Sequence, residues 1–191
     1  GNQAGNISST MDVLKSDLLS KFNYKYVGVA GHPEGSPDIS NHNLDLAIKE
    51  KNEFAKNVDF QMYIATQFFF EAKSLIDWEK HLSNLGNNLP IHAGIPGPAS
   101  IKTLINYARS CGIGNSLRFI SKQALNLTKL ATLSTPDKLM YELANYIITN
   151  QSSNLENIHF YAFGGMKKTA DWLNQLNSSE LNYNNKNQFV L

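Results

Sequence analysis

The chain has 191 residues, with 17 Lys or Arg against 16 Asp or Glu, and its formal net charge is +1. This balance excludes the strongly basic surface that nucleic acid or anionic lipid would attract. No apolar run approaches the roughly 20 residues needed to cross a bilayer, and no signal-peptide pattern opens the chain. The single cysteine, Cys111, excludes an intrachain disulfide and suits a reducing compartment. We therefore expect a cytoplasmic globular protein with no nucleic-acid or membrane partner.

The spacing of apolar residues predicts helices and strands in alternation. Ser8, Ser9 and Thr10 precede the first helical pattern and are its expected N-cap. Pro136 fits the first turn of a later helix. The predicted elements are, in chain order, a helix over residues 11–22, a strand over 24–30, a helix over about 44–56, a strand over 60–70, a helix that includes 75–82, a strand over 89–95, helices over 100–110, 116–130 and 136–149, a strand over 158–163 and a helix over 167–176.

This order predicts a parallel α/β sheet with right-handed crossovers. All four strands have the composition of strands buried on both faces, and each ends at a Gly/Pro or polar cluster. The carboxyl ends of parallel strands are where both α/β barrels and doubly wound sheets place their sites. Periodicity alone does not choose between these two folds. A closed barrel would need about four further βα units.

The strand over residues 60–70 ends in Gln67, which is followed by Phe68, Phe69 and Phe70. An amide left unpaired among aromatic rings costs roughly 1–3 kcal/mol. A flat heterocycle with donor and acceptor edges would be one partner for Gln67, and loop backbone would be the other. We expect the three phenylalanines to belong to the core, with at least one in the outer helical layer, because a strand alternates its faces.

Taken together, the strand-end motifs resemble those of the methylenetetrahydrofolate reductase family, a flavin-dependent (βα)8 TIM barrel. The motifs are residues 30–37 (AGHPEGSP), 66–71 (TQFFFE), 94–95 (GI) before a Pro-rich turn, and 159–161 (HFY). Their order and spacing match the ends of strands five to eight. The resemblance implies that residues 1–191 are one partial domain, the C-terminal half of the barrel, with a frayed tail over about 177–191. We expect the natural protein to start upstream. Residues 115–118 (NSLR) and 163–165 (FGG) are closer to a divergent bacterial branch.

The resemblance implies FAD contacts at the beginning of the chain. Gly1 and Asn2 stand where the family has an Arg-Gly-Asp sequence beside the flavin. Asn2 in place of the Asp removes a negative charge, which predicts easier formation of the reduced, anionic flavin. An Asn2→Asp variant should therefore have a lower redox potential. Ser9 and Thr10 would lie near FAD, chiefly through backbone groups at a helix N-terminus.

Four further residues are assigned to FAD by the resemblance. His32 would stack on or hydrogen-bond the cofactor, and the alternative is a solvent-facing histidine on a turn. Ser36 stands where the family has a His, so one expected contact is weakened. Asp45 and Lys51 match an acidic residue and a Lys that hold the adenosine and phosphate parts of FAD. Their alternative is an ordinary charged helix surface.

For the folate substrate, the resemblance implies that Gln67 hydrogen-bonds and orients the pterin ring. Thr103 and Tyr107 share one helical face and match a Gln and a Phe that touch folate. Ordinary helix packing is the alternative for Tyr107. Gly165 stands where the family commonly has a folate-binding Arg. The alternatives for that charge are Lys167, Lys168 and Arg118, and the glycine pair 164–165 could instead form a phosphate-accepting turn.

No metal site is expected, because the histidines lack ligand spacing. Those in predicted strands, His92 and His159, are expected in the core, and Cys111 is expected to be inert. The histidines are His32, His42, His81, His92 and His159.

The resemblance implies an FAD-dependent oxidoreductase of one-carbon metabolism and methionine biosynthesis, which reduces 5,10-methylenetetrahydrofolate to 5-methyltetrahydrofolate with NAD(P)H. Its general acid would be a Glu upstream of this chain, so the chain alone should be inactive. Two alternatives stay open: the same fold oxidising 5-methyltetrahydrofolate, and a folate- or flavin-binding partner protein without catalysis. A homo-oligomer is also left open.

Overall fold

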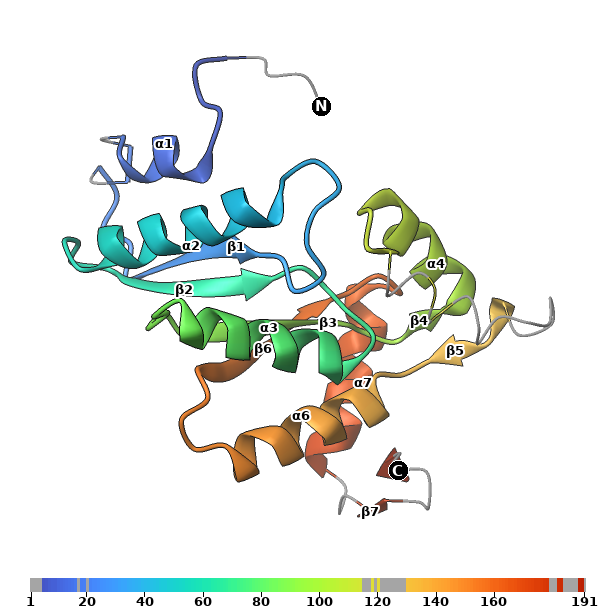
Figure 1. Cartoon of the computed structure of the whole chain (residues 1–191). Helices are drawn as coiled ribbons and strands as arrows, with labels where there is room; N and C mark the ends of the chain where they lie inside the picture. Colours follow the sequence, from blue (N-terminus) through green and yellow to red (C-terminus); the bar gives the residue numbers. More distant parts are fainter. Residues whose placement is uncertain are drawn as a thin grey trace.

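The computed structural model describes residues 5–178 except 17, 20, 115–117, 119 and 121–129, together with residues 182–183 and 189–190. Its centre is a four-stranded parallel sheet in the order β1-β2-β3-β6 (Figure 1). The strands are β1 (Tyr26–Gly31), β2 (Gln61–Thr66), β3 (Ile91–Pro96) and β6 (Leu155–Tyr161). Strand order follows chain order without reversal, whereas a doubly wound sheet reverses its order at a switch point.

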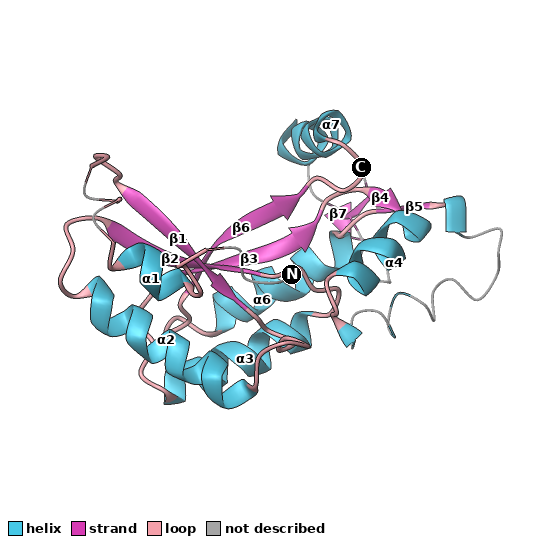
Figure 2. Ribbon diagram, turned by 90° about the horizontal axis from the view of Figure 1, so that it is seen from above, coloured by secondary structure: helices cyan, strands magenta, loops and turns pink. Residues whose placement is uncertain are grey.

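Three crossover helices cover one face of this sheet (Figure 2). They are α2 (Asn41–Ala55), α3 (Ala72–Asn84) and α6 (Asp137–Thr149). The core lies between them and the strands, where Ile64, Ile91 and Ile95 are fully buried. The last helix, α7 (Met166–Ser178), sets Trp172 edge-on against Phe160 of β6 at 5.7 Å between ring centroids. Sequential strands with helices on one face are the layout of a barrel wall, whereas a doubly wound sheet has helices on both faces.

No described helix covers the opposite face of the sheet, and the prediction of strands buried on both faces is wrong for β1 and β6. On β1, Tyr26 is 64% exposed. On the edge strand β6 four consecutive residues are exposed, so both of its faces are partly open, because neighbouring residues of a strand alternate sides. His159 is exposed, so its expected place in the core is wrong as well. His92 is half-buried and stacks on Tyr63 at 3.9 Å. The open face consists largely of Tyr, Gly, Ala and His, which are apolar enough to be mistaken in sequence for buried positions.

Two predicted elements are shorter than their apolar patterns. Helix α1 is only Thr10–Leu14, because the chain turns at Ser16, whose hydroxyl donates to the Val13 carbonyl at 2.6 Å and competes with helical bonding. Strand β2 ends at Thr66. Of the phenylalanines beyond it, Phe68 and Phe69 are in the core as predicted, at 1% and 0% exposed, and Phe70 is half-buried.

The remaining described elements lie outside the four-stranded sheet. Helix α4 (Ile101–Ser110) begins at Ser100, whose hydroxyl accepts from the Thr103 amide. Strands β4 (Ala99–Ser100) and β5 (Leu133–Ser134) pair antiparallel, as do β7 (Asn182–Tyr183) and β8 (Phe189–Val190) within the tail expected to be frayed. The helix predicted over residues 116–130 lies almost wholly outside the described residues. None of the described helices is long and apolar enough to cross a membrane.

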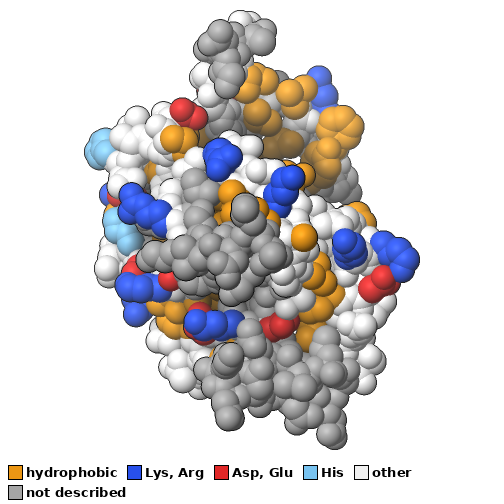
Figure 3. All heavy atoms as spheres, turned by 90° about the vertical axis from the view of Figure 1, so that its right-hand side faces the viewer, with side chains coloured by type: hydrophobic (Ala, Val, Ile, Leu, Met, Phe, Trp, Pro, Cys, Tyr) orange, Lys and Arg blue, Asp and Glu red, His pale blue; other side chains and the backbone are white. Residues whose placement is uncertain are grey.

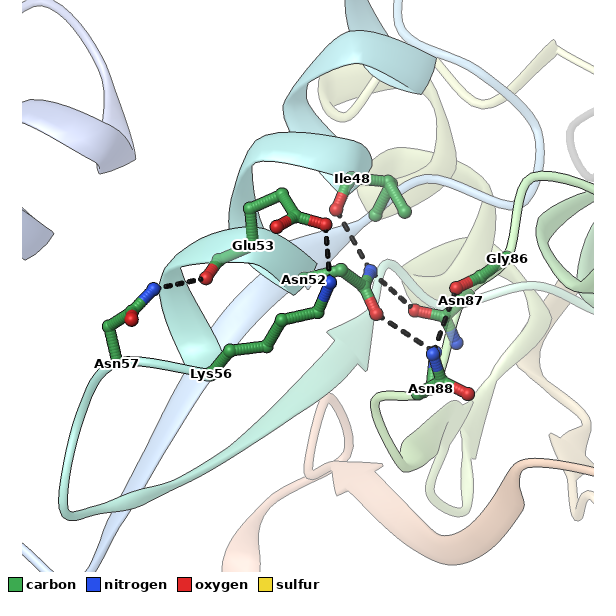
Figure 4. A network of polar contacts seen from close by, with 8 residues as sticks. All are labelled: Ile48, Asn52, Glu53, Lys56, Asn57, Gly86, Asn87 and Asn88. Atoms are coloured by element: carbon green, nitrogen blue, oxygen red, sulfur yellow. Dashed lines mark hydrogen bonds and ion pairs between the residues drawn. The ribbon is translucent and has the colours of Figure 1, made fainter.

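A network of asparagines joins the elements at the amino end of the sheet (Figure 4). Asn52 of α2 donates to the Ile48 carbonyl and to Asn87 Oδ1, both at 2.9 Å, and accepts from the Asn88 amide at 2.8 Å. Asn154 donates to the Asn87 carbonyl at 3.0 Å. These bonds connect α2 with the turns before β3 and β6. They therefore stabilise the amino end of the sheet, which is opposite to the end where the strand carboxyl ends lie.

Candidate functional site

A cavity of about 340 Å³ lies between the end of β1 and helices α1, α2 and α3. Its walls include residues from four elements that are far apart in the sequence. Five of the residues predicted to contact the cofactor line it: Ser9, Thr10, His32, Asp45 and Lys51.

Lys51 is the most unusual group in this cavity, because its side chain is a buried cation. The residue is 6% exposed, and its ammonium donates to the Ala30 carbonyl at the end of β1 at 3.0 Å. Burial lowers the pKa of this ammonium. No ion pair to Lys51 occurs among the described residues, and an ammonium has two N–H donors beyond the one given to Ala30. The side chain is therefore suited to an anionic ligand.

His32 stands between this cavity and a larger cleft of about 770 Å³. Burial, and next the charge of Lys51, lower the pKa of His32, so the imidazole is neutral at pH 7. Its carbonyl accepts from the Gly35 amide at 3.0 Å and closes the turn, for which Gly35 adopts a φ of +77°. Ser36 accepts from the Asp38 amide at 3.3 Å inside this loop and does not line either space.

Asp45 lines both spaces and is hydrogen-bonded to a residue that the sequence did not single out. His81 Nε2 of α3 lies 2.9 Å from Asp45 Oδ1, which joins α3 to α2. Trp78, one turn earlier on α3, also lines both spaces. Its ring fits against Gly31, where a Cβ atom would come within 2.8 Å of it. Arg118 lines the larger cleft.

The polar groups of Ser9 are engaged inside helix α1. Its hydroxyl accepts from the Asp12 amide at 3.2 Å, and its amide donates to Asp12 Oδ2 at 2.9 Å. Ser8 donates to the same carboxylate through its amide and its hydroxyl, and these bonds together lower the pKa of Asp12 to about 2. Thr10 is the first helical residue. Gly1 and Asn2 lie outside the described residues.

Gln67 stands immediately beyond β2, half-buried. Its backbone amide donates to the Gly31 carbonyl at 2.8 Å, so it is adjacent to a residue that lines the smaller cavity. Its side-chain oxygen accepts from the Phe68 amide at 3.2 Å. Loop backbone was one of the two partners expected for the Gln67 side chain, and it is the partner of the side-chain oxygen.

Aromatic rings connect Gln67 with α4. The ring of Phe68 meets Phe163 edge-on at 4.7 Å, and Phe163 stacks on Tyr107 at 4.1 Å with 19° between the planes. Tyr107 is 43% exposed, so one part of its ring is available to a ligand. Thr103 is half-buried, and its hydroxyl lies 2.8 Å from that of Ser100 in the helix cap. Helix α4 lies on the side of the molecule that Figure 3 presents, where hydrophobic side chains are exposed in several places between Lys and Arg.

Gly165 cannot be replaced by Arg without a change of backbone, because its φ is +107°. Lys167, one alternative source of the charge, is paired with Asp171 at 2.7 Å. Among the residues that the structure describes, no group of three or more His, Cys, Asp or Glu could hold a metal ion.

Sequence reasoning missed Trp78, His81 and the contacts of Phe163. Trp78 falls within the predicted helix that includes residues 75–82, and its spacing there is that of any core residue. Asp45 and His81 are 36 positions apart, and no local pattern relates them. A search for polar residues on neighbouring crossover helices near the strand carboxyl ends would have found this pair.

Comparison with known proteins relates almost the whole chain to one family. The family model described as methylenetetrahydrofolate reductase matches residues 4–177. Methylenetetrahydrofolate reductase 2 of Saccharomyces cerevisiae is 26% identical over 173 residues, which cover 84% of this chain and 27% of that protein. Methylenetetrahydrofolate reductase 1 of Schizosaccharomyces pombe is 33% identical over 105 residues, 51% of this chain and 16% of that protein. The chain thus spans a minor part of the length of these relatives.

Proposed function

The chain belongs to the methylenetetrahydrofolate reductase family, and from this we propose that the complete protein is an FAD-dependent oxidoreductase. Its reaction is the reduction of 5,10-methylenetetrahydrofolate to 5-methyltetrahydrofolate with NAD(P)H. The chain contributes strands five to eight of a (βα)8 barrel, and the rest of the barrel pairs with the edges of β1 and β6. The sequential strand order and the one-sided helical layer support this assignment.

The residues of the smaller cavity suit FAD. Lys51 would hold the diphosphate, because it is a buried ammonium with two N–H donors beyond the one given to Ala30. Asp45 would accept from ribose hydroxyls of the adenosine, with His81 fixing its carboxylate. His32 is a neutral imidazole at the cavity wall and would contact the cofactor as a hydrogen-bonding or stacking group. The bound flavin supplies the hydride relay between NAD(P)H and the folate.

The substrate residues lie at the same edge of the sheet. The Gln67 side chain would orient the pterin, and the exposed ring of Tyr107 would pack against the p-aminobenzoyl group. The observation that carries the proposal is the 2.8 Å bond between the Gln67 amide and the carbonyl of Gly31, a residue of the cofactor cavity. This bond supports the proposal, because it joins the residue that we assign to the pterin to a residue of the cavity that we assign to FAD. Gln67 positions the substrate, and the proton donor belongs to the part of the protein outside this chain.

The test is an anaerobic absorbance experiment on the complete protein. We expect a yellow protein that NADH or NADPH bleaches and that 5,10-methylenetetrahydrofolate reoxidises. A colourless protein that does not take up FAD would refute the proposal. Reduction of the flavin by 5-methyltetrahydrofolate but not by the nicotinamides would favour the reverse, oxidising reaction, and folate binding without flavin reduction would favour a non-catalytic partner. The isolated chain should be inactive, since two sheet edges are unpaired.

A further inference from the structure

The peptide that links Thr66 to Gln67 is bound from β1 and β6, and the Thr66 side chain beside it is bound from β3. The Gly31 carbonyl of β1 accepts from the Gln67 amide at 2.8 Å. The Gly94 amide of β3 donates to the Thr66 hydroxyl at 2.8 Å. The Tyr161 hydroxyl of β6 donates to the Thr66 carbonyl at 2.9 Å. The carbonyl that Tyr161 binds belongs to the same peptide group as the Gln67 amide, so the two bonds fix that group at both of its polar atoms.

The Tyr161 contact crosses the sheet. Strand β3 separates β6 from β2, and the phenol reaches over it at Gly94. A Cβ atom at Gly94 would lie 2.9 Å from the Tyr161 ring and 2.3 Å from the Thr66 carbonyl oxygen, so the glycine leaves the room that this contact needs. Burial raises the pKa of Tyr161, so its hydroxyl is a donor throughout the neutral range.

The ring of Tyr161 has a second set of contacts that does not depend on its hydroxyl. It meets Phe68 edge-on at 5.6 Å and lies nearly parallel to Phe163 at 5.5 Å. The aromatic packing therefore fixes the ring, and the ring aims the hydroxyl. Loss of the hydroxyl alone would leave the packing in place and release only the Thr66 carbonyl.

We propose that Tyr161 is a positioning residue: through the Thr66 carbonyl it fixes the peptide that bears Gln67, and so sets where the Gln67 amide meets the pterin. This inference rests on the proposed function and adds to it a residue that never touches the substrate. Small displacements of an orienting group are costly, because the reacting atoms must be held within a fraction of an ångström.

The test is Tyr161→Phe in the complete protein, with the two half-reactions measured separately by anaerobic stopped flow. Flavin reduction by NAD(P)H should be unchanged. In the folate half-reaction, the Kd for folate should rise roughly three- to tenfold, which corresponds to the contribution of one hydrogen bond. Tyr24→Phe is the matched control, since it removes a hydroxyl from an exposed ring that precedes β1 and lies outside the sheet. It should change neither half-reaction.

A double-mutant cycle separates positioning from a general loss of structure. In a Gln67→Ala background, Tyr161→Phe should have no further effect on the folate step, because the group that it positions is gone. An equal loss in both backgrounds, or no loss in either, overturns the inference while the proposed function stands. If the unmodified flavoprotein is not reoxidised by 5,10-methylenetetrahydrofolate at all, the proposed function fails first, and the inference fails with it.

Discussion

Replacement of Lys51 by Met should change cofactor affinity and apoprotein stability in opposite directions. Met has a similar length and no charge, so it keeps the packing of a side chain that is 6% exposed. It removes the ammonium that donates to Ala30 and lies in the predicted FAD cavity. The same burial that disfavours the charge in the apoprotein makes the charge effective toward a diphosphate, because the surrounding dielectric is low.

The expected loss of affinity follows from one charge-assisted hydrogen bond. Such a bond to a phosphate contributes roughly 1.5–3 kcal/mol, which corresponds to a Kd for FAD that is roughly 10- to 150-fold higher in the variant. In the apoprotein the variant should be the more stable form at neutral pH. The sign follows from the lowered pKa of Lys51: below its folded pKa the ammonium is buried at a cost, and this cost disappears as the pH rises toward the ordinary value of 10.5.

The assay is titration of the apoprotein with FAD, followed by quenching of flavin fluorescence, beside urea unfolding of the apoprotein. Lys49→Met is the control, since Lys49 is exposed on the same helix. The unfolding free energy of the wild-type apoprotein should rise as the pH approaches 10.5, and that of Lys51→Met should not. Equal FAD affinity for the two methionine variants would refute the assignment of Lys51 to the diphosphate.

Three further predictions concern the frame of the site and its pH dependence. Asn52→Ala should lower the free energy of unfolding by about 2–4 kcal/mol, because it leaves the buried Asn87 side-chain oxygen and the Asn88 amide short of a partner. Asn57→Ala, at an exposed position, should cost under about 1 kcal/mol in the same urea titration. Gly94→Ala should displace the end of β2 and weaken folate binding, since its Cβ atom would lie 2.3 Å from a backbone oxygen, whereas Gly114→Ala should not, because its Cβ atom would meet nothing within 4 Å. His32 should titrate below 6.5 by NMR, and Lys51→Met should raise its pKa by removing a nearby positive charge; no rise would contradict this coupling.

Several properties of this chain follow from local patterns. The order of strands and helices, the Gly/Pro loops at the strand ends and the N-cap at Ser9 were predictable, because each depends on residues within one or two turns of each other. The family was also predictable, since its strand-end motifs are contiguous in sequence, and the match over residues 4–177 confirms it. Boundaries were less certain: the apolar pattern continued past Leu14 although the helix ended there.

The tertiary structure decided which of these residues act together. The described helices leave one face of β1 open and both faces of the edge strand β6 partly open, and no periodicity reports which faces are covered. The contacts that make up the candidate site join residues 21, 36 and 95 positions apart, namely Lys51 with Ala30, His81 with Asp45, and Tyr161 with Thr66. Sequence patterns describe how a side chain is oriented on its own element. Which elements meet, and at what distance, depends on how the layers pack, and that is set only when the whole sheet forms.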